Sequence, residues 1–143
     1  MKAIPVWIVY ALLSMFFAGL TSVAAKMGLK NVSGDVGLAL RTSVVFALVW
    51  LNALAFHNMQ QASQLTKKDI VFLVISGITT TLSWVFYYRA IKEGNVSVVA
   101  SIDKASLIVT ILLAFWFLKE PLTARMLVAS GLILSGTLLL IFK

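Results

Sequence analysis

The sequence predicts an all-α fold, a polytopic membrane protein built as a bundle of five transmembrane helices. Two features of its composition indicate this class. Hydrophobic residues make up 61% of the 143 positions and charged residues only 12%, whereas a water-soluble domain keeps about 25% charged residues. The third observation is that the apolar residues gather in long uninterrupted runs, which gives a mean hydropathy of +1.01.

Five apolar segments are each long enough to cross a bilayer. They cover residues 4–25, 36–56, 70–88, 96–118 and 126–142. At about 1.5 Å per residue, each helix spans a hydrocarbon core of about 30 Å with little slack. Backbone in lipid must satisfy its own hydrogen bonds, so only helices or closed barrels span membranes, and these runs are too long for barrel strands. We therefore expect residues 1–143 to form a single five-helix transmembrane domain.

The polar residues exclude several functions. The net charge of +7 does not indicate nucleic-acid binding here, because Lys and Arg at the ends of membrane helices meet anionic headgroups. The sequence has no cysteine, and its single histidine, His57, lies in a polar loop. Thiol chemistry and a histidine or thiolate metal site are therefore excluded, and we expect no cofactor.

Lys and Arg are shared evenly between the two ends of the spans. With the amino terminus placed on side one, each side carries five: Lys2, Lys67, Lys68, Lys119 and Arg125 on side one, and Lys26, Lys30, Arg89, Lys92 and Lys143 on side two. An excess of these residues in short cytoplasmic loops normally sets the orientation. The balance predicts a chain that inserts both ways and pairs as an antiparallel homodimer. The alternative is a fixed topology set by the first helix or by a partner.

Three charged residues lie inside the spans. Arg41 is about six residues into the second span, and Asp103 and Lys104 are about eight into the fourth, depths of roughly 9 and 12 Å. Each such charge costs about 2.5–3.5 kcal/mol near a helix centre. Adjacent side chains are about 100° apart on a helix, so we expect Asp103 to pair with Arg41 rather than Lys104. The alternative is that Arg41 and Lys104 reach the headgroups while Asp103 joins two helices.

Polar residues in the spans also form stripes. In the third span Ser76, Thr80, Ser83 and Tyr87 follow helical spacing, and Trp84 lies beside them. Such residues often bond only to their own helix or pack between helices, but several aligned stripes indicate a polar cavity. Ionisable groups in spans usually mark transport pathways. The predicted substrate-binding or coupling residues are Arg41, Asp103, Lys104, Ser83, Trp84, Tyr87 and Ser14.

Three segments resemble one known family. They are Phe86–Ile91 followed by Glu93-Gly94-Asn95, Leu118-Lys119-Glu120-Pro121-Leu122, and Leu40-Arg41-Thr42. Their order is similar to that of EamA-like domains in the drug/metabolite transporter superfamily, over essentially the whole chain. Larger members join two five-helix units in opposite orientation, so the resemblance implies that two inverted copies of this chain rebuild a ten-helix transporter. Many members have proline early in the fourth helix, where this chain has Ser101-Ile102-Asp103-Lys104.

Together these features predict a small secondary transporter in the cell membrane, multi-pass, which moves a small polar metabolite by alternating access. Its expected partners are a second antiparallel copy, the lipid bilayer and the small-molecule substrate. The first acidic residue is Asp35, so antiport through an acidic first helix, as in small multidrug-resistance transporters, is not expected. The alternative is a non-transporting membrane subunit that assembles with a different partner protein. An enzyme is not expected, because one intramembrane carboxylate without nearby His or Cys forms no catalytic constellation.

Overall fold

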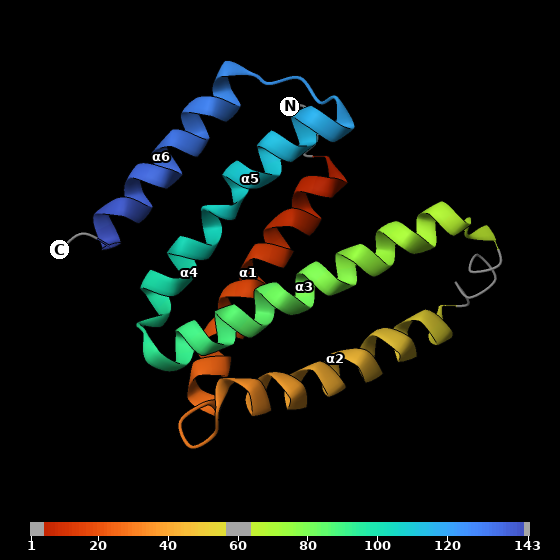
Figure 1. Cartoon of the computed structure of the whole chain (residues 1–143), viewed down its shortest axis with the longest axis vertical. Coiled ribbons are helices and arrows are strands. Elements are labelled where there is room, and N and C mark those ends of the chain that lie inside the picture. The colour runs from red at the N-terminus through yellow and green to blue at the C-terminus, as the bar shows by residue number, and fades with distance from the viewer. Residues whose placement is uncertain (1–4, 57–63, 142–143) are drawn as a thin grey trace. The chain divides into compact units, whose positions relative to one another are not determined.

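The computed structural model describes residues 5–56 and 64–141 (Figure 1). Within these ranges the regular secondary structure is entirely helical, with no strand. The all-α prediction is therefore confirmed. Lys2, His57 and Lys143 lie outside the described residues. The elements are α1 Val6–Gly28, α2 Gly34–Ala55, α3 Lys67–Glu93, α4 Val96–Lys104, α5 Ser106–Leu113, the π-helical turn η2 Ala114–Leu118, and α6 Ala124–Ile141.

Five helical segments of the described chain are long and apolar enough to span a membrane: α1, α2, α3, residues 96–118 taken together, and α6. These match the five predicted spans in order. Most of their large apolar side chains are exposed, as expected where helices face lipid or a second chain instead of water. The chain divides into two compact units, residues 1–92 and 93–143.

Side-chain caps form at the starts of α2 and α3. The Ser33 hydroxyl accepts a hydrogen bond from the Val36 N–H at 3.3 Å, at the start of α2. Before α3, Asp69 Oδ2 accepts from the Thr66 N–H at 3.0 Å, and Thr66 Oγ1 accepts from the Asp69 N–H at 3.3 Å. These bonds satisfy amide groups that a helix leaves without partners in its first turn.

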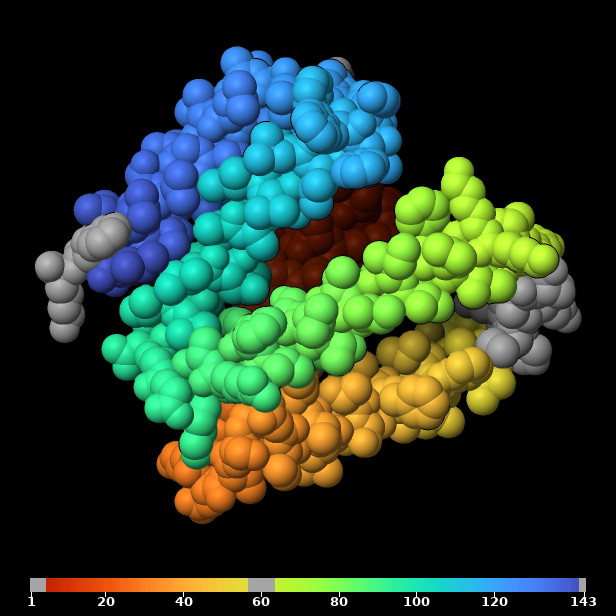
Figure 2. Space-filling model, viewed as in Figure 1, coloured from red at the N-terminus to blue at the C-terminus, as the bar shows by residue number. Residues whose placement is uncertain are grey.

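The buried core of the first unit lies where the α1–α2 connection meets the last turns of α3. Its buried apolar residues are Leu29, Leu38, Tyr88 and Ile91. Here α2 approaches α3 so closely that a Cβ on Gly34 would lie 3.0 Å from the carbonyl carbon and oxygen of Tyr88. The two helices converge at this end and separate toward the other (Figures 1 and 2). Glycine at position 34 therefore permits the contact that brings α2 against α3.

In the second unit the fourth span is interrupted. The span predicted over 96–118 is long and apolar enough to cross a membrane, and its helix breaks between α4 and α5 at Ala105. The Ala105 N–H donates to the Ile102 carbonyl at 3.0 Å, and the Ile108 N–H donates to the Ala105 carbonyl at 3.0 Å. Both are bonds across three residues, which wind the chain more tightly than an α-helix. The span ends at Lys119, whose positive φ of 58° closes η2.

Candidate substrate-binding and coupling site

Arg41 on α2 lies against two aromatic rings of α3. Its guanidinium carbon is 4.3 Å from the centroid of the Trp84 ring and 5.7 Å from that of Tyr88. Such contacts stabilise a cation by about 0.5–2 kcal/mol, more where water is excluded. Because Trp84 and Tyr88 are four residues apart on α3, they stand on one face of the helix. The structure therefore brings together two predicted site residues, Arg41 and Trp84, and adds Tyr88, which was not predicted.

One nitrogen of that guanidinium has no partner. Arg41 Nη1 is buried, and it is the only buried side-chain nitrogen or oxygen in the described residues without a hydrogen bond. Leaving a buried donor unpaired costs about 1–3 kcal/mol, and more for a charged group. Arg41 is thus held against the two rings while one of its buried donor nitrogens lacks an acceptor.

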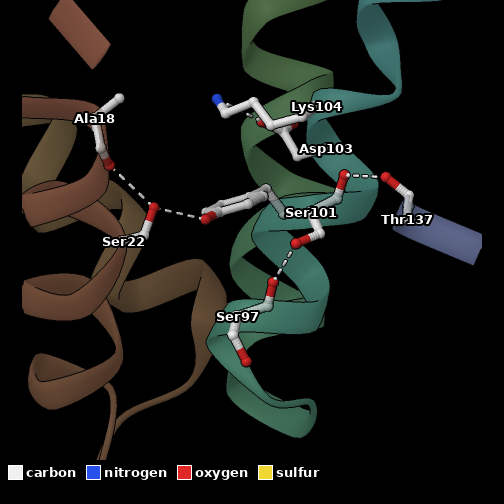
Figure 3. A network of polar contacts seen from close by, with 8 residues as sticks. Ala18, Ser22, Ser97, Ser101, Asp103, Lys104 and Thr137 are labelled. Atoms are coloured by element: carbon white, nitrogen blue, oxygen red, sulfur yellow. Dashed lines mark hydrogen bonds and ion pairs between the residues drawn. The ribbon is translucent and has the colours of Figure 1, made fainter. Parts of the chain in front are cut away.

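Tyr87 faces a different helix from its neighbour Tyr88. The Tyr87 hydroxyl donates to Ser22 Oγ on α1 at 2.7 Å, and Ser22 donates in turn to the Ala18 carbonyl at 3.0 Å (Figure 3). The two tyrosine rings are tilted by 59° with centroids 6.4 Å apart. Tyr87 therefore connects α3 to α1, and Tyr88 lies under Arg41 from α2. Ser22 was not among the predicted site residues.

Two predicted residues take no part in these contacts. Ser14 on α1 and Ser83 on α3 are exposed, and neither makes a hydrogen bond to any residue that the structure describes. Other span hydroxyls bond back to their own helix, as Thr21 does to Phe17 and Thr81 to Gly77. For those residues the alternative of purely local bonding is confirmed. A substrate role for Ser14 and Ser83 stays a prediction.

Asp103 and Lys104 pair with each other at the end of α4. Lys104 Nζ is 3.6 Å from Asp103 Oδ2, so the expectation that these neighbours do not face one another is wrong. The long lysine stem turns back toward the carboxylate where the helix ends. The distance is too long for a hydrogen bond, and both side chains remain partly exposed. The predicted pair between Asp103 and Arg41 stays a prediction.

A groove of about 690 Å³ opens beside Lys104 in the second unit. It runs between α4 and α5 on one flank and α6 on the other. Apolar side chains of α6, among them Leu132 and Ile133, form part of its wall. Its polar lining consists of Ser101, Lys104, Ser106, Thr110 and Thr137. Thr137 was not predicted, because it is the only polar side chain in an otherwise apolar stretch from 136 to 142.

Three of the cations counted on side two make defined contacts within the first unit. Arg89 binds Asp35 through two nitrogens, at 3.0 and 3.2 Å. Lys26 donates to backbone carbonyls in the last turns of α3. Lys92 donates to backbone carbonyls in the turn that follows α1. These side chains join the ends of α1, α2 and α3, so they have a structural role besides any effect on insertion.

Among the described residues, five helices long and apolar enough to span a membrane, with charged residues inside them, indicate a multi-pass membrane protein. The chain belongs to the EamA-like transporter family, which matches residues 5–142. A Sinorhizobium sp. protein described as an uncharacterized transporter in the cobO 3' region is 34% identical over 134 residues, covering 94% of this chain and 95% of that protein. No solved structure matches the chain significantly. Family and relative together indicate a small-molecule transporter rather than an enzyme.

Proposed function

We propose that this chain is a secondary transporter of a small polar metabolite with an anionic group. It acts by alternating access, as an antiparallel dual-topology homodimer in the cell membrane. The observation that carries the proposal is the unpaired Nη1 of Arg41. A planar guanidinium fixed on aromatic rings presents its edge in a set direction, and carboxylate oxygens match that edge in geometry and charge.

Lys104 and Asp103 are the second group of charged residues, after Arg41, in the proposed transport mechanism. Their ion pair is loose at 3.6 Å, so an anionic ligand that approaches Lys104 competes with a single long contact instead of a short hydrogen bond. Asp103 would pair with Arg41 in one state or exchange a proton with the substrate pathway. If the substrate displaces Asp103 from Lys104, substrate binding is coupled to the new pairing or proton exchange of Asp103.

The antiparallel dimer rests on the charge distribution along the sequence. Five Lys or Arg residues on each side leave no excess to orient the chain. Carriers commonly place their substrate at the interface of two inverted repeats. Two copies of this chain inserted in opposite directions supply such a pair, with one Arg41 and one Asp103 from each copy.

The first experiment measures uptake of four ¹⁴C-labelled compounds, pyruvate, lactate, glutamate and alanine, into proteoliposomes. Arg41→Ala should raise the KM at least tenfold or abolish uptake, because the fixed donor is lost. Arg41→Lys keeps the charge without the planar edge and should also raise the KM. The control is Arg89→Lys, which alters an arginine in an exposed ion pair but keeps the charge balance, and it should leave uptake nearly unchanged. Equal uptake by wild type and Arg41→Ala contradicts the proposed role of Arg41.

A second experiment tests the topology. Reporters fused after Lys143, a phosphatase active only outside the cytoplasm and a fluorescent protein active only inside, should both give signal. A strictly one-sided signal would instead favour the second candidate function, a membrane subunit that assembles with a different partner. No contact in the described structure favours that second function.

A further inference from the structure

The break at Ala105 takes the usual donor away from the Ser101 backbone carbonyl. In a continuous α-helix the Ala105 N–H would donate to the carbonyl of Ser101, four residues earlier. Here that N–H donates to Ile102 at 3.0 Å. The Ser101 hydroxyl does not compensate, since it donates to the Ser97 carbonyl at 2.8 Å. The Ser101 carbonyl therefore needs a donor from elsewhere.

Thr137 on α6 is that donor. Its hydroxyl lies 3.2 Å from the Ser101 carbonyl (Figure 3). It also lies 2.9 Å from the carbonyl of Ile133, in its own helix. The side chain is 5% exposed, so the hydrogen bond forms away from water. A hydroxyl has one hydrogen, and Thr137 shares it between two acceptors.

The shared hydrogen gives the Ser101 carbonyl a donor in either of two helix geometries. In the broken helix Thr137 satisfies the Ser101 carbonyl. In a continuous helix the Ala105 N–H would satisfy Ser101, and Thr137 would still donate to Ile133. The Ser101 carbonyl is thus paired in both geometries, which lowers the free-energy difference between two states of the helix.

The break also sets the shape of the groove. α6 packs against α4, and the groove of about 690 Å³ lies along α4, α5 and α6. Lys104 and Ser106 flank the break on either side and both line the groove. A change in the direction of α5 at Ala105 therefore alters the groove directly beside Lys104.

We propose that Thr137 is a positioning residue whose hydroxyl stabilises the broken form of the fourth span, and that α5 swings about Ala105 during transport. The proposal deepens the transport function proposed above and rests on it. The hinge itself is decided by a distance measurement that needs no substrate.

The sequence contains no cysteine, so two introduced cysteines carry spin labels without background. One replaces Leu112 on α5 and the other Val128 on α6, in the full chain in lipid nanodiscs. Thr137→Val keeps the shape but removes the donor, so the continuous helix should dominate. The segment from Ala105 to the label at position 112 has about eight residues, so a change of about 20° in the direction of α5 moves the label by about 4 Å. Thr137→Ser keeps the hydroxyl and should give the wild-type distance.

The control for loss of a buried hydroxyl is Ser130→Ala. Ser130 also lies on α6, and its hydroxyl donates only to the Met126 carbonyl of that helix, at 2.7 Å. The Ser130→Ala variant should leave the α5–α6 distance unchanged. In the uptake assay with the four labelled compounds, Thr137→Val should lower the maximal rate about tenfold with little change in KM, and Thr137→Ser should restore the rate.

The outcomes separate the two proposals. An unchanged α5–α6 distance in Thr137→Val overturns the hinge, whatever the uptake shows. A shifted distance without uptake of any compound by wild type supports the hinge and counts against the proposed transport of these compounds. Equal losses of uptake in Thr137→Val and Ser130→Ala, with no distance change in either, indicate a packing role and overturn the positioning role.

Discussion

Lys26 and Lys92 cap each other's helices. The Lys26 ammonium donates to the carbonyls of Ile91 and Lys92 at 2.6 and 3.0 Å, in the last turn of α3. The Lys92 ammonium donates to the carbonyls of Leu29 and Lys30, just beyond α1. Carbonyls at a helix end lack intrahelical donors and carry partial negative charge, so each lysine satisfies acceptors that would otherwise be unpaired. The two helices are thereby joined at the buried end of the first unit.

Replacing either lysine should destabilise the first unit. Lys26→Ala and Lys92→Ala should each cost about 1–3 kcal/mol, because each leaves partly buried carbonyls without a charged donor. The double variant should cost less than the sum, since both bonds join the same two helix ends. Thermal unfolding in detergent, followed by circular dichroism, measures the effect. Lys30→Ala is the control, because its side chain makes no polar contact within the described residues; an equal loss there would argue against capping.

Gly34→Ala should destabilise the protein more than the addition of a single methyl group suggests. The added Cβ would lie 3.0 Å from the Tyr88 backbone, so α2 must move away from α3 at a cost of about 1–3 kcal/mol. Because Tyr88 lies under Arg41, uptake should fall as well. Gly19→Ala is the matched control: it adds the same methyl group where nothing lies within 4 Å, and it should be neutral or stabilising by up to about 1 kcal/mol. Similar unfolding midpoints for both variants would contradict the close approach of the helices.

Asp103→Asn should abolish or uncouple transport. The substitution keeps shape and polarity but removes the charge that pairs with Lys104 and the group that would exchange a proton. Uptake into proteoliposomes is measured with and without an imposed pH gradient. The control Asp35→Asn alters an exposed ion pair with Arg89 and should change uptake little. Full gradient-driven uptake by the Asp103 variant would remove this residue from the mechanism.

Removing two charges from one side should fix the orientation. Lys67→Ala with Lys68→Ala leaves three cations on side one against five on side two. The richer side stays in the cytoplasm, so the reporter after Lys143, on side two, should give only the cytoplasmic signal. Replacing both lysines by arginine keeps the balance and should preserve signal on both sides. Two-sided signal from the alanine variant would show that charge balance does not control insertion.

The structure brings two of the predicted site residues, Arg41 and Trp84, into contact, and the substrate-binding role of the whole set stays a prediction. Arg41 and Trp84 were both named from the sequence, because a charge and a tryptophan inside apolar runs are visible without knowledge of the fold. Tyr88 was not chosen, because only its contact with Arg41 on α2 distinguishes it from its neighbour Tyr87. The pairing of Asp103 with Lys104 was missed because it depends on the end of α4 at Ala105.

The sequence by itself determined the class of protein and the number of spans. Lipid excludes unpaired backbone groups, so long apolar runs have to form helices, whatever their neighbours are. Only the tertiary structure decided which helix faces meet. The stacking of Arg41 on α3, the reciprocal capping by Lys26 and Lys92, and the bond from Thr137 to the Ser101 carbonyl all join residues at least 36 positions apart. Such contacts depend on side-chain or backbone groups of a second helix, and the spacing of side chains along one helix carries no information about them.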